Sequence, residues 1–239
     1  MKSPLDTGEL VVLETVDSTQ AAAESALLSG EPAGVVFAHA QTSGKGRRGR
    51  EWYSEKDHSL TVSFIFRDYA NHPKPWLIGM AVALAAAGAV HARVAWPNDL
   101  MLRGKKVGGI LSQIVTTPEG DRVPVVGLGI NLNVSEFPSE LAEIAANVEA
   151  KDSASGGAFV VLQAIIERLS SLPEPEEFAN LKPIWKLFDE TPGKRYHLND
   201  GNIAVGIGVG ADGELVCAVD GETMTVLAAD AIFGELHTA

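Results

Sequence analysis

Between residues 92 and 132 the chain alternates short apolar runs with tight turns, and this pattern limits the folds open to it. The runs are ARVAW, LMLR, KKVGGILSQIVTT and RVPVVGLGINL. Two neighbouring strands that run parallel need a crossover connection of a dozen or more residues, usually a helix, and the connections between these runs are shorter than that. We therefore expect an antiparallel sheet here, and an α+β fold rather than a doubly wound one.

Further strands and helices surround this region. Apolar runs at residues 10–14 and 34–38 predict buried strands, and the alternation in LTVSFIF predicts another at 60–66. Helices are predicted between the capping residues Asp17–Thr19 and Gly30, and over residues 76–90, 139–147, 157–170 and 175–189, the last interrupted by Pro183.

The C-terminal part has its own pattern. From Gly193 short alternating runs are joined by Asn-Asp-Gly, Ala-Asp-Gly and Asp-Gly-Glu turns, as in a small β-barrel or meander. We expect a main domain over residues 1–190 and a small β domain over 191–239. Cys217, the one cysteine, falls in such a run and is expected to be a small buried hydrophobe, which fits a reducing cytoplasm.

The charge balance argues against two classes of partner. Nineteen Lys and Arg against 31 Asp and Glu give a net charge of -12, which opposes non-specific attraction to nucleic acid or an anionic membrane surface. The most apolar stretch, residues 76–90, is shorter than the roughly 20 residues that a bilayer requires. We expect neither DNA nor a membrane as a partner.

One segment inverts this charge. Four cations and three glycines, with no acid among them, lie between Gly44 and Arg50. Glycine lets backbone N–H groups approach a ligand and guanidinium groups match phosphate or carboxylate oxygens, so the segment predicts an anion-binding loop. A solvated basic loop is the alternative. A dinucleotide fold is disfavoured because residues 50–59 leave no room for a crossover helix, and a phosphate loop because Gly46, not Ser or Thr, follows Lys45.

Two further segments carry polar groups or glycines at strand ends. Asn98 and Asp99 follow a proline, where turn chemistry alone would account for them. Gly108 and Gly109 interrupt a strand, as happens where a ligand or another backbone comes close.

Other residues limit the kinds of catalytic site that the chain can form. Lys105 and Lys106 point to opposite faces of their strand, so at most one joins such a site. Asn131 ends another apolar strand as a turn residue or a polar contact. The six histidines are scattered and no HExxH, Cys-pair or G-x-S-x-G pattern occurs, so neither a resident metal nor a serine nucleophile is expected.

Taken in order, five motifs over residues 11–134 resemble the biotin protein ligase family. They are DSTQ at 17–20, QTSGKGRRGREW at 41–52, WPNDL at 96–100, GKKVGGIL at 104–111 and GLGINLNV at 127–134. The resemblance implies a catalytic domain with a mixed sheet related to class II aminoacyl-tRNA synthetases, followed by a small SH3-like domain. Because the first strand begins near residue 10, the DNA-binding repressor function of the bifunctional members is not expected.

The resemblance also implies a two-step reaction. The carboxylate of biotin attacks the α-phosphorus of MgATP to give biotinyl-5′-AMP and pyrophosphate, and a lysine of a biotin carboxyl carrier protein then takes the acyl group. Cations must offset the repulsion between carboxylate and phosphate. A homodimer is left open.

The resemblance assigns roles to individual residues. The expected catalytic residues are Arg47, Arg50 and Lys106. The expected biotin-binding residues are Ser18, Thr19, Gln20, Gln41, Lys45, Gly46, Arg47, Lys106, Gly108 and Gly109. The expected residues for ATP and the adenylate are Arg47, Arg50, Trp52, Asn98, Asp99, Lys106 and Asn131. We expect the loop at 41–52 to order over the adenylate and to shield it from water.

Three residues depart from the family's pattern. Lys45 stands where Arg is usual, Ala95 where a basic residue is common, and Gln20 where Asn is usual. Two alternatives stay open: a lipoate or octanoyl ligase or transferase, which shares the fold but lacks the GKGRRGR-type loop, and an inactive protein that binds biotinyl-AMP, for which Lys45 and Ala95 argue.

Overall fold

The computed structural model describes residues 1–148, 157–228 and 231–233. Its main sheet has seven strands in the order β1-β2-β3-β7-β6-β5-β4. The strands are β1 Glu9–Leu13, β2 Ala33–Ala38, β3 Ser59–Ile65, β4 Arg93–Ala95, β5 Asp99–Leu102, β6 Lys105–Thr116 and β7 Arg122–Asn131. Only β1 and β2 are parallel, and β4 to β7 form the expected antiparallel array.

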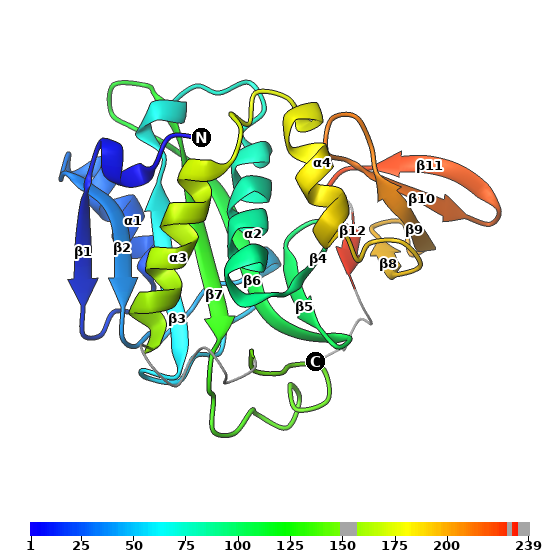
Figure 1. The fold of residues 1–239 in the computed structure, drawn as a ribbon, viewed down its shortest axis with the longest axis horizontal. Coiled ribbons are helices and arrows are strands. Elements are labelled where there is room, and N and C mark those ends of the chain that lie inside the picture. Colours follow the sequence, from blue (N-terminus) through cyan, green and yellow to red (C-terminus); the bar gives the residue numbers. More distant parts are fainter. Residues whose placement is uncertain (149–156, 229–230, 234–239) are drawn as a thin grey trace.

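Helices cover both faces of this sheet (Figure 1). They are α1 Thr19–Leu28, α2 Trp76–Val90, α3 Gly157–Ser171 and α4 Phe178–Phe188, with short 3-10 turns at Pro4–Asp6, Arg47–Gly49 and Arg67–Tyr69. Helices α2 and α3 pack over one face in the larger hydrophobic core. Helix α1 packs on the opposite face in a smaller core that includes Val123 and Val125 of β7.

Helix α2 is enclosed on all sides. Its sequence is apolar all round, and every residue from Leu77 to Gly88 is buried. Its close fit to the sheet depends on Gly79, because a Cβ there would lie 2.1 Å from Ser112 Oγ. Within the described residues, no helix combines the length and apolar character needed to cross a membrane.

The C-terminal residues form a second sheet, antiparallel throughout, in the order β11-β10-β9-β8-β12. Its strands are β8 Arg195–Leu198, β9 Ile203–Val209, β10 Leu215–Val219, β11 Glu222–Val226 and β12 Ala231–Phe233. Cys217 is a buried free thiol, as predicted, and burial raises its pKa. Tyr196 and Leu215 belong to the same core as α2, and the rings of Trp96 and Tyr196 lie 5.8 Å apart.

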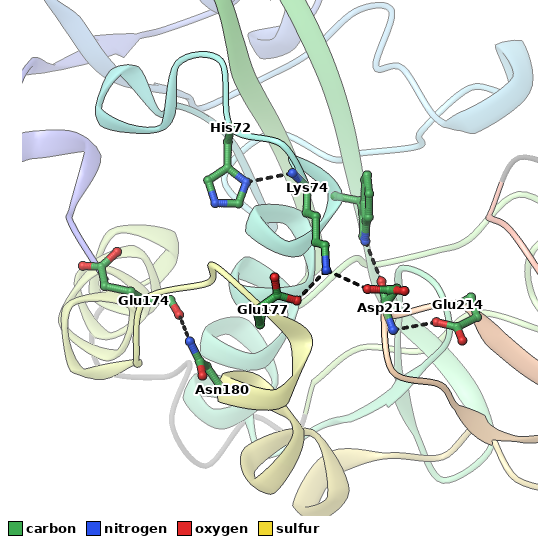
Figure 2. A network of polar contacts seen from close by, with 8 residues as sticks. His72, Lys74, Glu174, Glu177, Asn180, Asp212 and Glu214 are labelled. Atoms are coloured by element: carbon green, nitrogen blue, oxygen red, sulfur yellow. Dashed lines mark hydrogen bonds and ion pairs between the residues drawn. The ribbon is translucent and has the colours of Figure 1, made fainter.

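Polar contacts reinforce the junction between the two sheets. Figure 2 shows Lys74, just before α2, between the carboxylates of Glu177 and Asp212, with 2.6 Å from its Nζ to Asp212 Oδ1. Two indoles hold the β9–β10 turn: Trp76 Nε1 donates to Asp212 O at 2.8 Å, and Trp96 Nε1 donates to Gly213 O at 2.9 Å. The turn between β9 and β10 is thus attached to the start of α2 and the end of β4.

One predicted helix is wrong. Residues 139–144 form hydrogen-bonded turns, and the chain then pairs with β6: Lys106 N donates to Ile144 O at 2.8 Å and Ala146 N donates to Lys106 O at 2.9 Å. Pairing with β6 outweighs the helical preference of this short segment. The predicted N-cap is wrong in part, because Ser18 occupies that position without bonding the helix.

Candidate active site

The site lies on the α1 face of the main sheet, at the point where α1 stops covering it. Along β7 the side chains on this face are Val123 and Val125, which contact α1, and then Gly127 and Gly129, which lie beyond the start of the helix. Gly129 is paired with Gly109 of β6. Three positions without side chains therefore form the floor of a pocket.

This pocket brings together most of the predicted site residues. Those lining it are Ser18, Thr19, Gln20, Gln41, Lys45, Gly46, Arg47, Arg50, Trp52, Asn98, Asp99, Lys106 and Gly109. Residues as far apart in sequence as Ser18 and Gly129 thus meet, because α1, the loop at 41–52 (the basic loop) and strands β5 to β7 converge on the glycine floor.

Two predicted residues lie elsewhere. Gly108 is paired with Ile130 on the opposite face, where an added Cβ would lie 2.8 Å from Gly129 O and 2.9 Å from Leu100 Cδ1. Its small size is required for packing. Asn131 is buried, and its amide donates to Ala146 O at 3.2 Å rather than facing the pocket.

The sequence reasoning also missed lining residues, notably Ser63, Gly127 and Gly129. The glycines alternate within the GLGIN run and so share one face, and Ser63 is a polar residue inside an apolar strand. The alternating glycines and the polar Ser63 could therefore have been selected from the sequence as candidate pocket residues. That these residues face each other follows from the pairing of Ser63 with Gly127 between β3 and β7.

One end of the pocket is a buried chain of uncharged polar groups. Gln41 Oε1 accepts from Thr19 N at 2.8 Å and from Thr19 Oγ1 at 3.1 Å. Ser63 Oγ lies 3.0 Å from Thr19 Oγ1 and 3.1 Å from Gln20 Oε1. Thr19, Gln20 and Ser63 are each less than 5% exposed, so this network holds its groups in fixed directions.

Ser18 stands next to this network with its hydroxyl unused. The residue is 2% exposed, and Ser18 Oγ has no hydrogen-bond partner among the described residues. It does not cap α1, although it occupies the N-cap position. A buried hydroxyl without a partner costs about 1–3 kcal/mol, so its presence in a pocket wall indicates a polar ligand group.

The other end of the pocket is cationic. Arg47 Nη1 donates to Asn98 Oδ1 at 3.1 Å, and its Nη2 donates to the carbonyl of Ala228 beyond β11. Lys106 Nζ lies 2.6 Å from Asp99 Oδ1. Burial lowers the pKa of the Arg47 guanidinium, and the neighbouring Asp99 carboxylate opposes this shift.

Trp52 closes the pocket over its floor. A Cβ on Gly129 would lie 2.3 Å from Trp52 Cε2, so the indole rests directly on that glycine. Lys106 Nζ is 5.8 Å from the centre of the same ring, within the range of a cation–π contact. The basic loop that carries Trp52 is folded back on itself: Trp52 N donates to Gly44 O at 2.8 Å and Gly46 N donates to Arg50 O at 2.7 Å.

A second, mostly apolar cavity of about 730 Å³ adjoins the cationic end. It lies between α2, β6 and the C-terminal sheet, and shares Arg47, Asn98 and Ile110 with the pocket. Within the described residues, no three His, Cys, Asp or Glu side chains gather to hold a metal ion.

The chain is similar in sequence to known ligases. The chain is 32% identical over 148 residues to the bifunctional ligase/repressor BirA of Bacillus spizizenii, covering 58% of this chain and 46% of that protein. It is 32% identical over 117 residues to the biotin--[acetyl-CoA-carboxylase] ligase of Mycobacterium tuberculosis, covering 45% and 41%. The chain thus spans about half the length of the curated relatives it matches.

The fold is also that of a solved structure. The biotin protein ligase from Aquifex aeolicus in complex with biotin and ATP superposes with a TM-score of 0.69 at 24% identity, over 95% of this chain and 98% of that one. The model of the biotin/lipoate A/B protein ligase family matches residues 12–131, half of the chain, and contains the basic loop and the glycine floor. The chain belongs to the biotin/lipoate A/B protein ligase family.

Proposed function

We propose that the protein is an ATP-dependent biotin protein ligase, which forms biotinyl-5′-AMP and transfers biotin to a lysine of a biotin carboxyl carrier protein. Family membership, the names of the relatives and the division of the pocket into a neutral polar end and a cationic end support this proposal. Within the family, the choice between biotin and lipoate depends on the polar end.

The Ser18 hydroxyl, which has no hydrogen-bond partner among the described residues, is the observation that favours biotin over lipoate. The ureido ring of biotin offers a carbonyl acceptor and two N–H donors, which match Ser18 and the neighbouring amides. Gln41 uses its oxygen on Thr19, which leaves its NH2 group as a donor for a ligand. The dithiolane ring of lipoate offers no strong hydrogen-bond partner and would leave these buried groups unpaired, at a cost of about 1–3 kcal/mol each.

The first step joins two anions, and the cationic end is suited to it. A carboxylate oxygen of biotin attacks the α-phosphorus of ATP, and the bond from that phosphorus to the pyrophosphate oxygen breaks. We assign Arg47, Arg50 and Lys106 to offset the repulsion and to stabilise the charge that grows on the phosphoryl oxygens. Asp99 pairs with Lys106 in the structure, and we propose that substrate anions compete for this lysine.

Magnesium would arrive with ATP rather than reside in the protein. Mg²⁺ bound to nucleotides takes one or two carboxylates together with phosphate oxygens and water. Asp99 is largely buried beside the cations, and with Asn98 it supplies carboxylate and amide oxygens of the type that Mg²⁺ prefers. These two residues would hold the ion, which supplies charge neutralisation at the phosphates.

In the second step the amine of the carrier lysine attacks the acyl carbon, an amide forms and AMP leaves with the bonding electrons. We propose that the carrier docks along β6. Strand β5 pairs with β6 only as far as Gly109, and within the described residues nothing pairs with that side of residues 111–116. Because the chain carries a net charge of -12, we expect recognition by shape and strand pairing, with weak salt dependence if the carrier is also acidic.

We also propose that residues 191–239 form an SH3-like domain that follows a boundary at residue 190. The antiparallel pairing of β8 to β12 supports this proposal.

The loop at 41–52, which carries Trp52, would shield the adenylate from water. An inactive binder is the less favoured alternative. Ala95, which is paired with Asp99, is not basic, but Lys106 supplies a cation beside Asp99 in its place. A cytoplasmic location and a homodimer stay predictions.

Pyrophosphate exchange into ATP tests the proposal. Biotin should support exchange and lipoate should not, and a carrier domain should gain the mass of one biotinyl group on lysine. Exchange with lipoate but not with biotin would identify a lipoate protein ligase instead. Tight binding of biotinyl-AMP without exchange would instead identify an inactive binder.

A further inference from the structure

Gln113 joins the polar end of the pocket from outside it. The residue lies on β6 where this strand pairs with β7 but no longer with β5; it is exposed and does not line the pocket. Its side-chain oxygen nevertheless accepts a hydrogen bond from Gln20 Nε2 at 3.0 Å. The polar chain of Thr19, Gln20, Gln41 and Ser63, of which only Gln41 is partly exposed, thus ends at a surface residue on β6.

The contacts of Gln20 fix the direction of its amide. Gln20 Nε2 also donates to the carbonyl of Val125 at 3.1 Å, and a carbonyl can only accept, so the NH2 group faces β6 and β7. The oxygen therefore faces Ser63 Oγ at 3.1 Å and the pocket. Both N–H bonds have partners, one from the Val125 backbone and the other from Gln113.

The amide lies directly on the glycine floor. A Cβ on Gly127 would lie 2.6 Å from Gln20 Oε1, which is a closer approach than any side chain allows. Gln20 is 3% exposed, so an N–H that loses its partner has little access to water. A second acceptor for this amide therefore matters more here than it would at the surface.

We propose that Gln113 is a positioning residue for the head group of the substrate. By accepting the second N–H of Gln20, it holds Gln20 Oε1 where this oxygen accepts an N–H of the cyclic urea. The inference rests on the proposed function, since it names the ligand group that Gln20 meets. It assigns Gln113 an effect on recognition of the head group at the polar end and none on the chemistry at the cationic end.

Three variants test this inference in the biotin-dependent pyrophosphate exchange assay. Gln113→Met keeps the length of the side chain and removes the acceptor, so we expect the KM for biotin to rise about five- to tenfold with kcat and the KM for ATP within about twofold. Gln113→Glu keeps an acceptor and should restore a KM within about twofold of wild type. Gln163→Met makes the same substitution on the exposed side of α3, on the face of the sheet opposite the pocket, and as the matched control it should change none of these constants.

The outcomes separate the two proposals. Wild type that exchanges with biotin, together with a Gln113→Met variant of unchanged KM, overturns the positioning role alone. A rise that Gln113→Glu fails to reverse also overturns it, because loss of the acceptor is then not the cause. Wild type without biotin-dependent exchange overturns the proposed function and the ligand group named here with it. Circular dichroism of each variant checks that the fold is retained.

Discussion

Replacing Gly129 by alanine should push Trp52 off the floor of the pocket. The new Cβ would lie 2.3 Å from Trp52 Cε2 and 2.4 Å from Trp52 Nε1, whereas carbon atoms in contact lie about 3.5 Å apart. The indole must therefore move by roughly 1 Å, since Gly129 is held in place by pairing with both β3 and β6.

The size of the effect follows from this overlap. Overpacking by one methyl group costs about 1–3 kcal/mol, which for a chain of this size lowers Tm by about 3–9 °C. Trp52 also ends the basic loop, through its N–H bond to Gly44 O, so displacing the indole should disturb the cations that the loop carries. We expect slower pyrophosphate exchange alongside the loss of stability.

A double-mutant cycle measured by thermal unfolding isolates the contact. In a Trp52→Ala background the Gly129→Ala change should lose most of its cost, giving a coupling energy of about 1–3 kcal/mol. Gly208→Ala is the matched control, because a Cβ at Gly208 meets no atom within 4 Å. If Gly129→Ala destabilises no more than Gly208→Ala, or equally with and without Trp52, then the indole does not rest on this glycine.

Three further predictions concern charged side chains. Lys106→Met should slow exchange by at least about 100-fold, while Lys105→Met, on the opposite face of β6, should leave it within twofold; full exchange by the first variant contradicts our assignment. Lys45→Arg should slow release of biotinyl-AMP, because a bidentate guanidinium replaces a point charge, and equal release rates would dismiss the idea. Hydrogen bonds from Ser135 lower the pKa of Glu55, so its ionised form stabilises the fold above the unfolded pKa of about 4.3 and this contribution disappears as pH falls through the lowered value. The Tm difference between wild type and Glu55→Gln should therefore be largest at neutral pH and vanish in strong acid, and a constant difference would refute it.

Local patterns predicted those parts of the fold that depend on local physics. The short connections between residues 92 and 132 required antiparallel pairing, and the glycines and cations after Gln41 indicated a loop built for anions. The helix expected at 139–147 failed because a remote strand, at Lys106, offers this segment backbone partners that no local pattern reveals. Propensity yields to such long-range pairing.

The same limit applies to the site. Most of the residues assigned from the five motifs do line one pocket, with Gly108 and Asn131 as exceptions. Ser63 stands out in the sequence as a polar residue inside an apolar strand, but its place opposite Gly127 depends on the register between β3 and β7. Gly108 was a different kind of error. Strand alternation places it and Gly109 on opposite faces, so one of the pair had to be a packing residue, and this argument was available from the sequence.

The larger hydrophobic core extends under both sheets, and this limits how the protein can be re-engineered. Side chains of the C-terminal strands, Tyr196 and Leu215 among them, belong to the same cluster as Trp96 and helix α2. Grafting the C-terminal segment of a relative onto residues 1–190 would replace part of the packing around Trp96 and leave voids or overlaps there. Useful chimeras would therefore exchange the Trp96 and α2 contacts together with the segment, so that the boundary follows the packing rather than the chain.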